Sequence, residues 1–154
     1  MNTIRVWRCC HRRYKDSAFT GEWARSFGAR FNSEGIAAVY TSGTLSLSLL
    51  EILVQANDRS QLRHYVLFQA DIPGPLIDTP KPRDLPAGWD KIPHGHVSQQ
   101  FGDLWIESKT YPVLRVPSVA VPVEYNYVLN PNHPDFESIR TTQIKEAAID
   151  PRLY

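Results

Sequence analysis

The order of strands and helices along the chain is the feature that limits the fold most strongly. Runs of β-branched and aromatic residues predict strands over residues 4–9, 37–41, 64–70, 113–116, 119–121 and 125–129. Apolar residues at helical spacing predict only two helices, 46–56 and 98–108. Because strands and helices do not alternate, a doubly wound parallel sheet is disfavoured. We predict an α+β fold, one compact domain over residues 1–154, with a mixed, mostly antiparallel sheet and flanking helices.

Other segments carry weaker patterns. Six prolines interrupt residues 73–93, and proline both withholds a ladder donor and stops helices, so we expect an irregular surface excursion there. Residues 11–27 predict a loop with at most a short helical turn near Glu22, and the chain beyond Asp135 reads as a polar tail. Gly102 weakens the helix predicted at 98–108.

Composition and charge exclude several classes of protein. The chain has 154 residues, 42% of them hydrophobic and 21% charged, with a formal net charge of +1, which suits a globular domain and gives no basic field for nucleic acid. Cys9 and Cys10 are the only cysteines, and neighbouring cysteines bridge each other only with strain. With no signal-like N-terminus and no apolar run of membrane-spanning length, we expect free thiols in a soluble cytoplasmic protein with no membrane contact.

One compact stretch brings three chemically active side chains together. A tight turn at 28–32 presents Arg30, the following strand carries Tyr40, and the next helix, capped by Thr44 or Ser46, carries Glu51. A cation, a phenol and a carboxylate in one loop–strand–helix unit indicate a binding or catalytic site.

The helix at 46–56 determines where the carboxylate points. Leu47, Leu50 and Val54 form one apolar stripe, which predicts a buried helix, and Glu51 falls on that stripe. A carboxylate there is costly unless it is paired or hydrogen-bonded. The alternative is that Glu51 reaches solvent through a gap in the packing.

Several common catalytic motifs are absent from the sequence. There is no P-loop, no Gly-x-Gly-x-x-Gly, no Cys-x-x-Cys and no His-Glu-x-x-His. His94 and His96 form the only close histidine pair, and no carboxylate or cysteine partner accompanies them, so we predict no metal site.

An ordered set of motifs over nearly the whole chain resembles the RES domain, the toxin of bacterial Xre–RES toxin–antitoxin pairs. The set comprises Arg8, Gly28-Ala29-Arg30-Phe31-Asn32, Val39-Tyr40-Thr41-Ser42, Leu49-Leu50-Glu51, Gly102-Asp103-Leu104-Trp105, Leu114-Arg115-Val116-Pro117-Ser118 and the run Asn126 to Pro134. The usual family pattern is Gly-Gly-Arg-Trp-Asn, so Ala29 and Phe31 depart from it, and Ser48 stands where an alanine is usual.

The resemblance implies an ADP-ribosyltransferase-like fold and a toxin that uses NAD as substrate, with no separate cofactor. Nicotinamide would be released by hydrolysis or phosphorolysis, or ADP-ribose would be transferred to a protein, and an Xre-type antitoxin would be the partner. Carried over residue by residue, the resemblance assigns Glu51, Arg30 and Tyr40 to catalysis. It assigns Arg8, Ser118, Asn126 and His133 to substrate binding, the last two less directly.

These residue types suit that chemistry. Cleavage puts positive charge on the ribose, which the Glu51 carboxylate can stabilise. The planar forks of Arg8 and Arg30 match a pyrophosphate. Tyr40 offers a ring to stack on nicotinamide, and Ser118 a hydroxyl for the amide or ribose.

Interpretations without a catalytic role stay open for single residues and for the whole chain. Arg8 suits a solvated arginine, Tyr40 a core tyrosine and Ser118 a turn serine. The chain as a whole also suits a catalytically inactive binding module. A ribonuclease toxin is disfavoured by the nearly neutral charge. The sequence leaves open the ADP-ribose acceptor and the oligomeric state.

Overall fold

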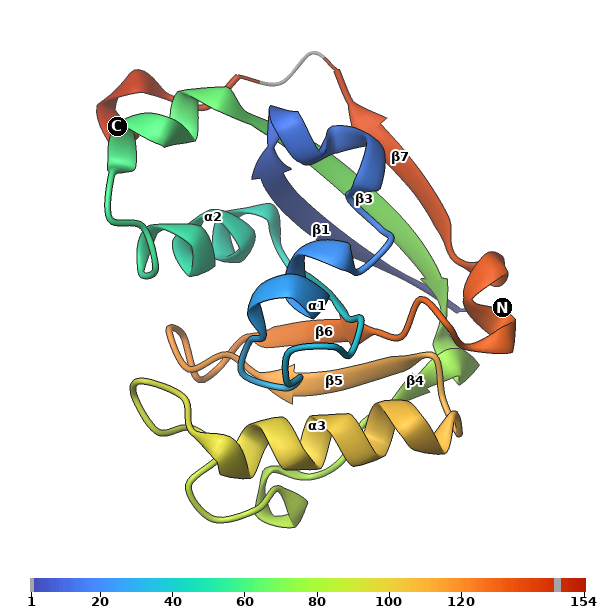
Figure 1. The fold of residues 1–154 in the computed structure, drawn as a ribbon. Helices are drawn as coiled ribbons and strands as arrows, with labels where there is room; N and C mark the ends of the chain where they lie inside the picture. The colour runs from blue at the N-terminus through green and yellow to red at the C-terminus, as the bar shows by residue number, and fades with distance from the viewer. Residues whose placement is uncertain (1, 146–147) are drawn as a thin grey trace.

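A computed structural model describes residues 2–145 and 148–154. Its strands form one curled, mixed sheet in the order β4-β5-β6-β2-β1-β3-β7 (Figure 1). Only the β4–β5 pair is parallel among the described strands, which confirms the predicted α+β fold with a mostly antiparallel sheet. The strands are β1 (Thr3–His11), β2 (Val39–Ser42), β3 (Tyr65–Pro73), β4 (Ile77–Asp78), β5 (Val113–Pro117), β6 (Tyr125–Leu129) and β7 (Arg140–Ile144). The helices are α1 (Glu22–Phe27), α2 (Leu45–Leu53) and α3 (His96–Ser108).

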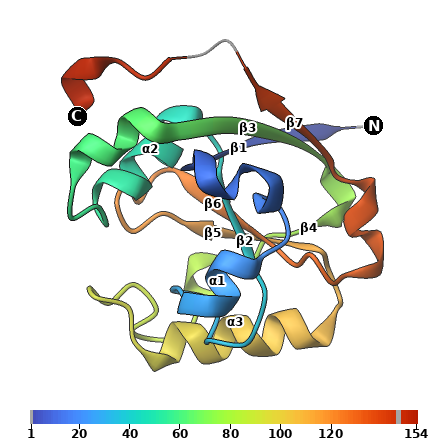
Figure 2. The same cartoon turned by 45° about the horizontal axis from the view of Figure 1, so that its top comes forward.

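The sheet divides into two parts that meet at one point. β1 pairs with β3 along its full length, from Thr3 opposite Pro73 to His11 opposite Tyr65. β1 meets β2 only where Trp7 lies opposite Ser42. Figures 1 and 2 show β7, β3 and β1 turning away from β2, β6 and β5. The end of β2 therefore stands where the two parts diverge, directly before α2.

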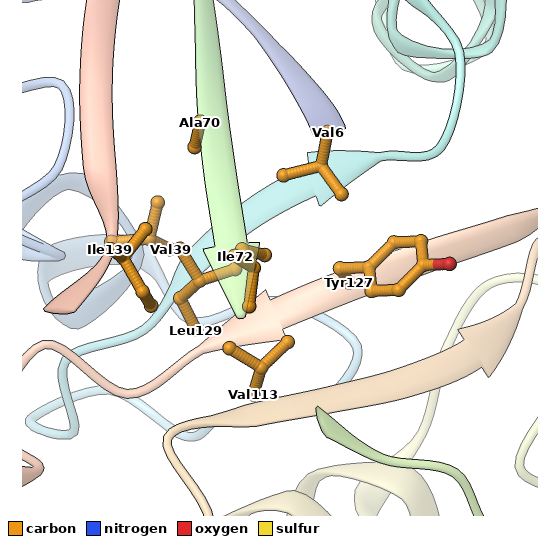
Figure 3. Close-up of a cluster of buried hydrophobic side chains, with 8 residues drawn as sticks. All are labelled: Val6, Val39, Ala70, Ile72, Val113, Tyr127, Leu129 and Ile139. Atoms are coloured by element: carbon orange, nitrogen blue, oxygen red, sulfur yellow. The ribbon is translucent and has the colours of Figure 1, made fainter. Parts of the chain in front are cut away.

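Alternation along the strands gives the sheet two different faces. On one face, side chains from both parts form an apolar cluster (Figure 3): Val6, Val39, Ala70, Ile72, Val113, Tyr127, Leu129 and Ile139. On the other face, Leu114, Val116 and Val128 of β5 and β6 pack with Ala24 of α1 and Ile106 of α3. Both faces of the central strands are therefore covered.

Gly102 has a packing role that the sequence prediction did not anticipate. A Cβ atom at this position would overlap the backbone carbonyl of Phe31. The helix α3 is intact across Gly102 and lies directly against the 28–32 turn. The lack of a side chain at Gly102 thus lets α3 pack directly against the turn that contains Arg30.

The predicted apolar stripe of the helix after β2 is wrong in part. Thr44 caps α2, accepting a hydrogen bond from the Leu47 amide at 3.1 Å, but α2 ends at Leu53 rather than residue 56. Leu47 is buried as expected, whereas Leu50 is 41% exposed and Val54 65% exposed. A helix that is apolar nearly all round does not reveal which side meets the sheet, and here that side carries Leu47 and Ser48.

Several further segments differ from the sequence predictions. The predicted strand at 119–121 is a turn, because Ser118 accepts a hydrogen bond from the Val121 amide and donates its own amide proton to the Glu124 carbonyl. The tail after Asp135 contains β7, which pairs with β3. The proline-rich excursion contains β4, and Arg12–Ser17 form a 3₁₀ helix where a loop was predicted. In residues 2–145 and 148–154, no helix is long and apolar enough to span a bilayer.

Candidate functional site

Glu51 lies at the centre of a polar network that joins α2 to the β5–β6 hairpin. Its Oε1 accepts a hydrogen bond from Ser118 Oγ at 2.6 Å and another from Asn126 Nδ2 at 2.7 Å. The prediction that this carboxylate is hydrogen-bonded, rather than turned away through a gap, is therefore confirmed. Its second oxygen, Oε2, accepts no hydrogen bond from the described residues, and Glu51 is only half-buried.

The two donors to Glu51 are themselves held in place. Ser118 is buried, and its Oγ accepts a hydrogen bond from the Val121 amide at 3.0 Å, which directs its own proton to Glu51. Asn126 Oδ1 accepts a hydrogen bond from Ser42 Oγ at 2.7 Å. Figures 1 and 2 both show α2 and the β5–β6 turn on the same side of the molecule. Strands and a tight turn, rather than a long loop, fix this carboxylate.

Tyr40 is fixed through its hydroxyl. The hydroxyl donates to Asn32 Oδ1 at 2.7 Å and accepts from the Phe31 amide at 3.0 Å. Burial raises the pKa of Tyr40. The buried Asn32 is anchored in turn, because its Nδ2 donates to the carbonyls of Ala24 and Ile36. The phenol hydroxyl therefore braces the 28–32 turn, while the partly buried ring packs against the apolar cluster beneath helices α1 and α3.

Arg30 projects from the same turn with half of its guanidinium engaged. Its Nη1 donates to the carbonyls of Trp89 and Lys91, each at 2.9 Å. Burial lowers the pKa of Arg30, and the negative charge of Glu51 is the foremost influence opposing that shift. Arg30 and Glu51 thus lie within electrostatic reach of each other. The Nε and Nη2 groups have no hydrogen-bond partner in the described part of the chain, so this edge can donate to an anion.

The departures from the family pattern sit in well-packed positions. Phe31 is buried, stacks on Trp89 at 6.2 Å between ring centroids and meets Phe101 edge-on at 6.4 Å. Ala29 is held by Gln99, whose Nε2 donates to its carbonyl at 3.1 Å. Helix α3 therefore clamps this turn with both substituted residues in place.

Arg8 is placed apart from the Glu51 network. Its Nε donates to the Ala18 carbonyl at 2.6 Å and its Nη1 to the Tyr40 carbonyl at 2.9 Å. Burial lowers the pKa of Arg8. On β1, Arg8 projects to the opposite face from Trp7, whose cross-strand partner is Ser42. Arg8 thus links β1 to the backbone carbonyls of Ala18 and Tyr40, and a direct contact with substrate stays a prediction.

His133 lies beyond the far end of β6 from Asn126. It is buried, and its Nδ1 accepts a hydrogen bond from the Asp135 amide at 3.0 Å, which caps the 3₁₀ helix Pro134–Ser138. The structure thus brings Glu51, Ser118 and Asn126 into contact, but it gives His133 the contacts of a cap. Its substrate-binding role stays a prediction.

Outside the Glu51 network, the described residues form a cavity near the C-terminal segment but no metal-binding cluster. Among the described residues, no group of three His, Cys, Asp or Glu side chains is placed to hold a metal ion. Burial lowers the pKa of His94, and the nearby charge of Arg30 lowers it further. A cavity of about 230 Å³ lies at the C-terminal segment, lined by Arg63, Tyr65, Ala148, Ile149 and Tyr154. None of these residues makes one of the hydrogen bonds that hold Glu51, Ser118 and Asn126.

Three residues with clear positioning contacts were not assigned a role from sequence. Ser42 and Asn32 lie inside the quoted motifs, and each is buried with its side chain bonded to a site residue. Asp103 accepts hydrogen bonds from the amide and the hydroxyl of Ser33. A small polar residue adjacent to a candidate site residue was the available signal, but its partner becomes visible only in three dimensions.

Comparisons with known proteins show which family the chain belongs to. The chain matches the RES domain family over residues 5–150. A protein named Toxin Res from Yersinia enterocolitica is 38% identical, and the match covers 96% of this chain and 98% of that protein. A protein named Prs ADP-ribosylating toxin from a Sphingobium strain is 34% identical, over 98% and 97% of the two chains. A further Toxin Res, from Photorhabdus laumondii, is 34% identical over 96% of each chain. The chain therefore belongs to the RES domain family.

Proposed function

We propose that this protein is a toxin that cleaves NAD at the bond between nicotinamide and ribose. The observation that carries the proposal is the arrangement of Glu51. One of its oxygens is held by Ser118 and Asn126, while the other accepts no bond from the described residues. A carboxylate fixed in this way, within electrostatic reach of Arg30, is a preorganised negative charge for a cationic transition state.

The bond changes fit these residues without a metal ion or an acid. The C1′–N bond breaks, and nicotinamide leaves with the electron pair as a neutral base. Positive charge then develops on C1′ and the ring oxygen of the ribose, as in other glycosidic cleavages. Glu51 stabilises that charge and accepts hydrogen bonds from the ribose hydroxyls through Oε2. Water or phosphate attacks C1′, and water gives up its proton to solvent or to Glu51.

Arg30 and Tyr40 bind the two groups on either side of the reacting ribose, the pyrophosphate and the nicotinamide. The Nε and Nη2 edge of Arg30 offers two parallel donors to the pyrophosphate. The ring of Tyr40 stacks on nicotinamide, and its hydroxyl, already committed to Asn32 and Phe31, takes no part in proton transfer. In this scheme, Arg8 acts through the backbone carbonyl of Tyr40.

The test is nicotinamide release from NAD by the purified protein, with and without inorganic phosphate. We expect ADP-ribose as the product in water and its 1-phosphate if phosphate is the acceptor. Glu51→Gln keeps the shape but removes the charge, and we expect kcat to fall about a hundredfold or more. Glu22→Gln, an exposed glutamate of α1, is the matched control and leaves the rate unchanged. Equal rates for Glu51→Gln and the unmodified protein would reject the proposal.

Transfer of ADP-ribose to a protein is the second candidate. It is favoured by the relative named Prs ADP-ribosylating toxin, whose match covers 98% of this chain. The same side chains would serve, since only the nucleophile that attacks C1′ differs. NAD labelled in its adenylate phosphate, incubated with cell lysate and the toxin, separates the candidates. Label on a protein band supports transfer, whereas label only in free ADP-ribose or its phosphate supports NAD destruction.

We propose that the partner of this toxin is an Xre-type antitoxin, because membership of the RES family implies an antitoxin in general. Co-expression with the cognate antitoxin is expected to restore growth and to suppress nicotinamide release. Growth arrest that persists in the presence of a well-expressed antitoxin would count against this pairing.

A further inference from the structure

We propose that Ser42 and Asn126 are positioning residues for Glu51. In this arrangement, Ser42 holds the Asn126 amide so that its NH₂ group faces the carboxylate. The structural part of the proposal rests on geometry alone, and its kinetic consequence rests on the proposed NAD cleavage.

The register of two strands builds this arrangement. Ser42, the last residue of β2, lies directly opposite Asn126 of β6. Directly opposite residues of an antiparallel pair share a face, with Cβ atoms about 5 Å apart. Ser42 is buried, and its Oγ reaches Asn126 Oδ1 at 2.7 Å. Trp7 of β1 pairs with Ser42 on the other edge of β2, so strands on both sides fix this position.

The direction of the hydrogen bonds follows from the carboxylate. An ionised carboxylate only accepts hydrogen bonds, so the end of the Asn126 amide that contacts Glu51 must be its NH₂ group. Its oxygen then faces Ser42, and the Ser42 hydroxyl must donate. One amide proton goes to Glu51, and the Ser42 hydroxyl proton goes to the amide oxygen, which together favour a single orientation of the amide.

Both donors to Glu51 reach the same oxygen. Asn126 and Ser118 approach Oε1 from β6 and from the β5–β6 turn, and together they hold the carboxylate by one side. Oε2 is thereby directed away from the protein donors. Without Ser42, the Asn126 oxygen loses its donor and the amide gains rotational freedom, so the carboxylate loses one of its two fixed supports.

The kinetic test compares Ser42→Ala and Asn126→Asp with matched controls. Ser42 acts behind Asn126, so we expect Ser42→Ala to lower kcat about tenfold while KM changes less than about twofold. Ser42→Thr retains the hydroxyl and should recover most of the rate. Ser46→Ala, on the exposed side of α2, should have no effect.

Asn126→Asp provides a readout that loss of structure would not produce. At low pH, the introduced carboxyl carries a proton and can still donate it to Glu51. As the pH rises, that proton is lost, two carboxylates face each other, and activity should fall about a hundredfold across the transition. The unmodified amide does not titrate, so the parent protein lacks this fall. Asn57→Asp, an exposed control, should keep the parent profile. A uniform loss at every pH for Asn126→Asp would overturn the positioning role.

The side-chain amide resonances of Asn126 test the geometry without any activity. We expect Glu51→Gln and Ser42→Ala each to shift them, with Ser46→Ala leaving them in place. If neither variant moves these resonances, the hydrogen-bond chain is absent and the proposal falls, whatever the enzyme does. Shifted resonances in a protein that releases no nicotinamide would support the chain and remove only the proposed function.

Discussion

The two faces of β2 and β6 differ, although the same two strands build both. On one face, Val39 and Leu129 join the apolar cluster shared by both parts of the sheet. On the other face, which we call the polar face, Val128 packs in the second apolar cluster, whereas Tyr40, Ser42 and Asn126 carry hydroxyl and amide groups. Each of these three makes a side-chain hydrogen bond to another site residue. Period-two alternation thus lets two short strands serve as core and as site at once.

Apolar packing and polar hydrogen bonding contribute differently to the folded protein. Burying apolar area contributes to the free energy of folding. A buried polar network gains little net stability over apolar packing, but it permits few arrangements of its members. We therefore expect changes on the apolar face to lower stability, and changes to the polar side chains Tyr40, Ser42 and Asn126 to alter geometry and catalysis more than stability.

The largest effect on stability is expected for Leu129→Ala on the apolar face. Leu129 is fully buried, so its truncation should lower the free energy of unfolding by about 3 kcal/mol. Urea unfolding provides the measurement. The control is Leu104→Ala, which removes a side chain that is 70% exposed in α3 and should change stability by less than about 0.5 kcal/mol. A small loss for Leu129→Ala would contradict this expectation, because the cluster on the apolar face would then contribute little to stability.

A smaller effect is expected for Tyr40→Phe on the polar face. The change leaves Asn32 Oδ1 and the Phe31 amide without this partner, which should cost about 1–2 kcal/mol of stability. The stacking ring is retained, so the rate of nicotinamide release should fall less than about tenfold. Tyr111→Phe, on an exposed tyrosine, serves as control. A much larger loss of rate would show that the hydroxyl transfers a proton, contrary to its role here.

The pH dependence of stability gives a second test of the Tyr40→Phe variant. Because burial raises the pKa of Tyr40 above its ordinary value of 10.0, the unfolded chain ionises this tyrosine first. The folded protein should therefore lose stability as the pH rises above 10, and Tyr40→Phe should lose less over that range. Parallel stability curves for the two proteins would contradict the buried hydroxyl.

The smallest effect is expected far from both faces, at Asp71 in β3. Arg5 donates to this carboxylate at 2.7 Å, and that hydrogen bond lowers the pKa of Asp71 below 3.8. Stability from the pair is present above pH 3.8 and is lost as the pH falls through the lowered value. Because the pair is exposed, Asp71→Asn should lower the urea midpoint only slightly at neutral pH, with no difference at strongly acidic pH. A difference that grows on acidification would contradict this assignment.

Much of the fold was predictable because strong local patterns determine it. The runs at 4–9, 64–70 and 125–129 are β-prone and form strands β1, β3 and β6. β7 was missed because Arg140–Ile144 is polar and mostly exposed, and it is held as an edge strand by backbone pairing with β3. Such pairing leaves no hydrophobic signal in the sequence.

The site was predictable as a set of residues but not as a set of contacts. Sequence reasoning named Glu51, Ser118 and Asn126, and the structure joins them. It could not find Ser42, because its partner lies 84 positions away and only strand register brings the two together. It also could not show that Arg8 lies apart from the Glu51 network. The face of β1 that carries Arg8 was predictable, but the divergence of β1 from β2 was not.

The most direct test of the central claim is a crystal structure of the Glu51→Gln variant with NAD bound. We predict that a hydroxyl of the nicotinamide ribose lies about 3 Å from the side chain at position 51, with the pyrophosphate on Arg30 and the nicotinamide against the Tyr40 ring. NAD bound elsewhere, for example in the cavity beside Tyr65, with no contact to position 51, would contradict the account.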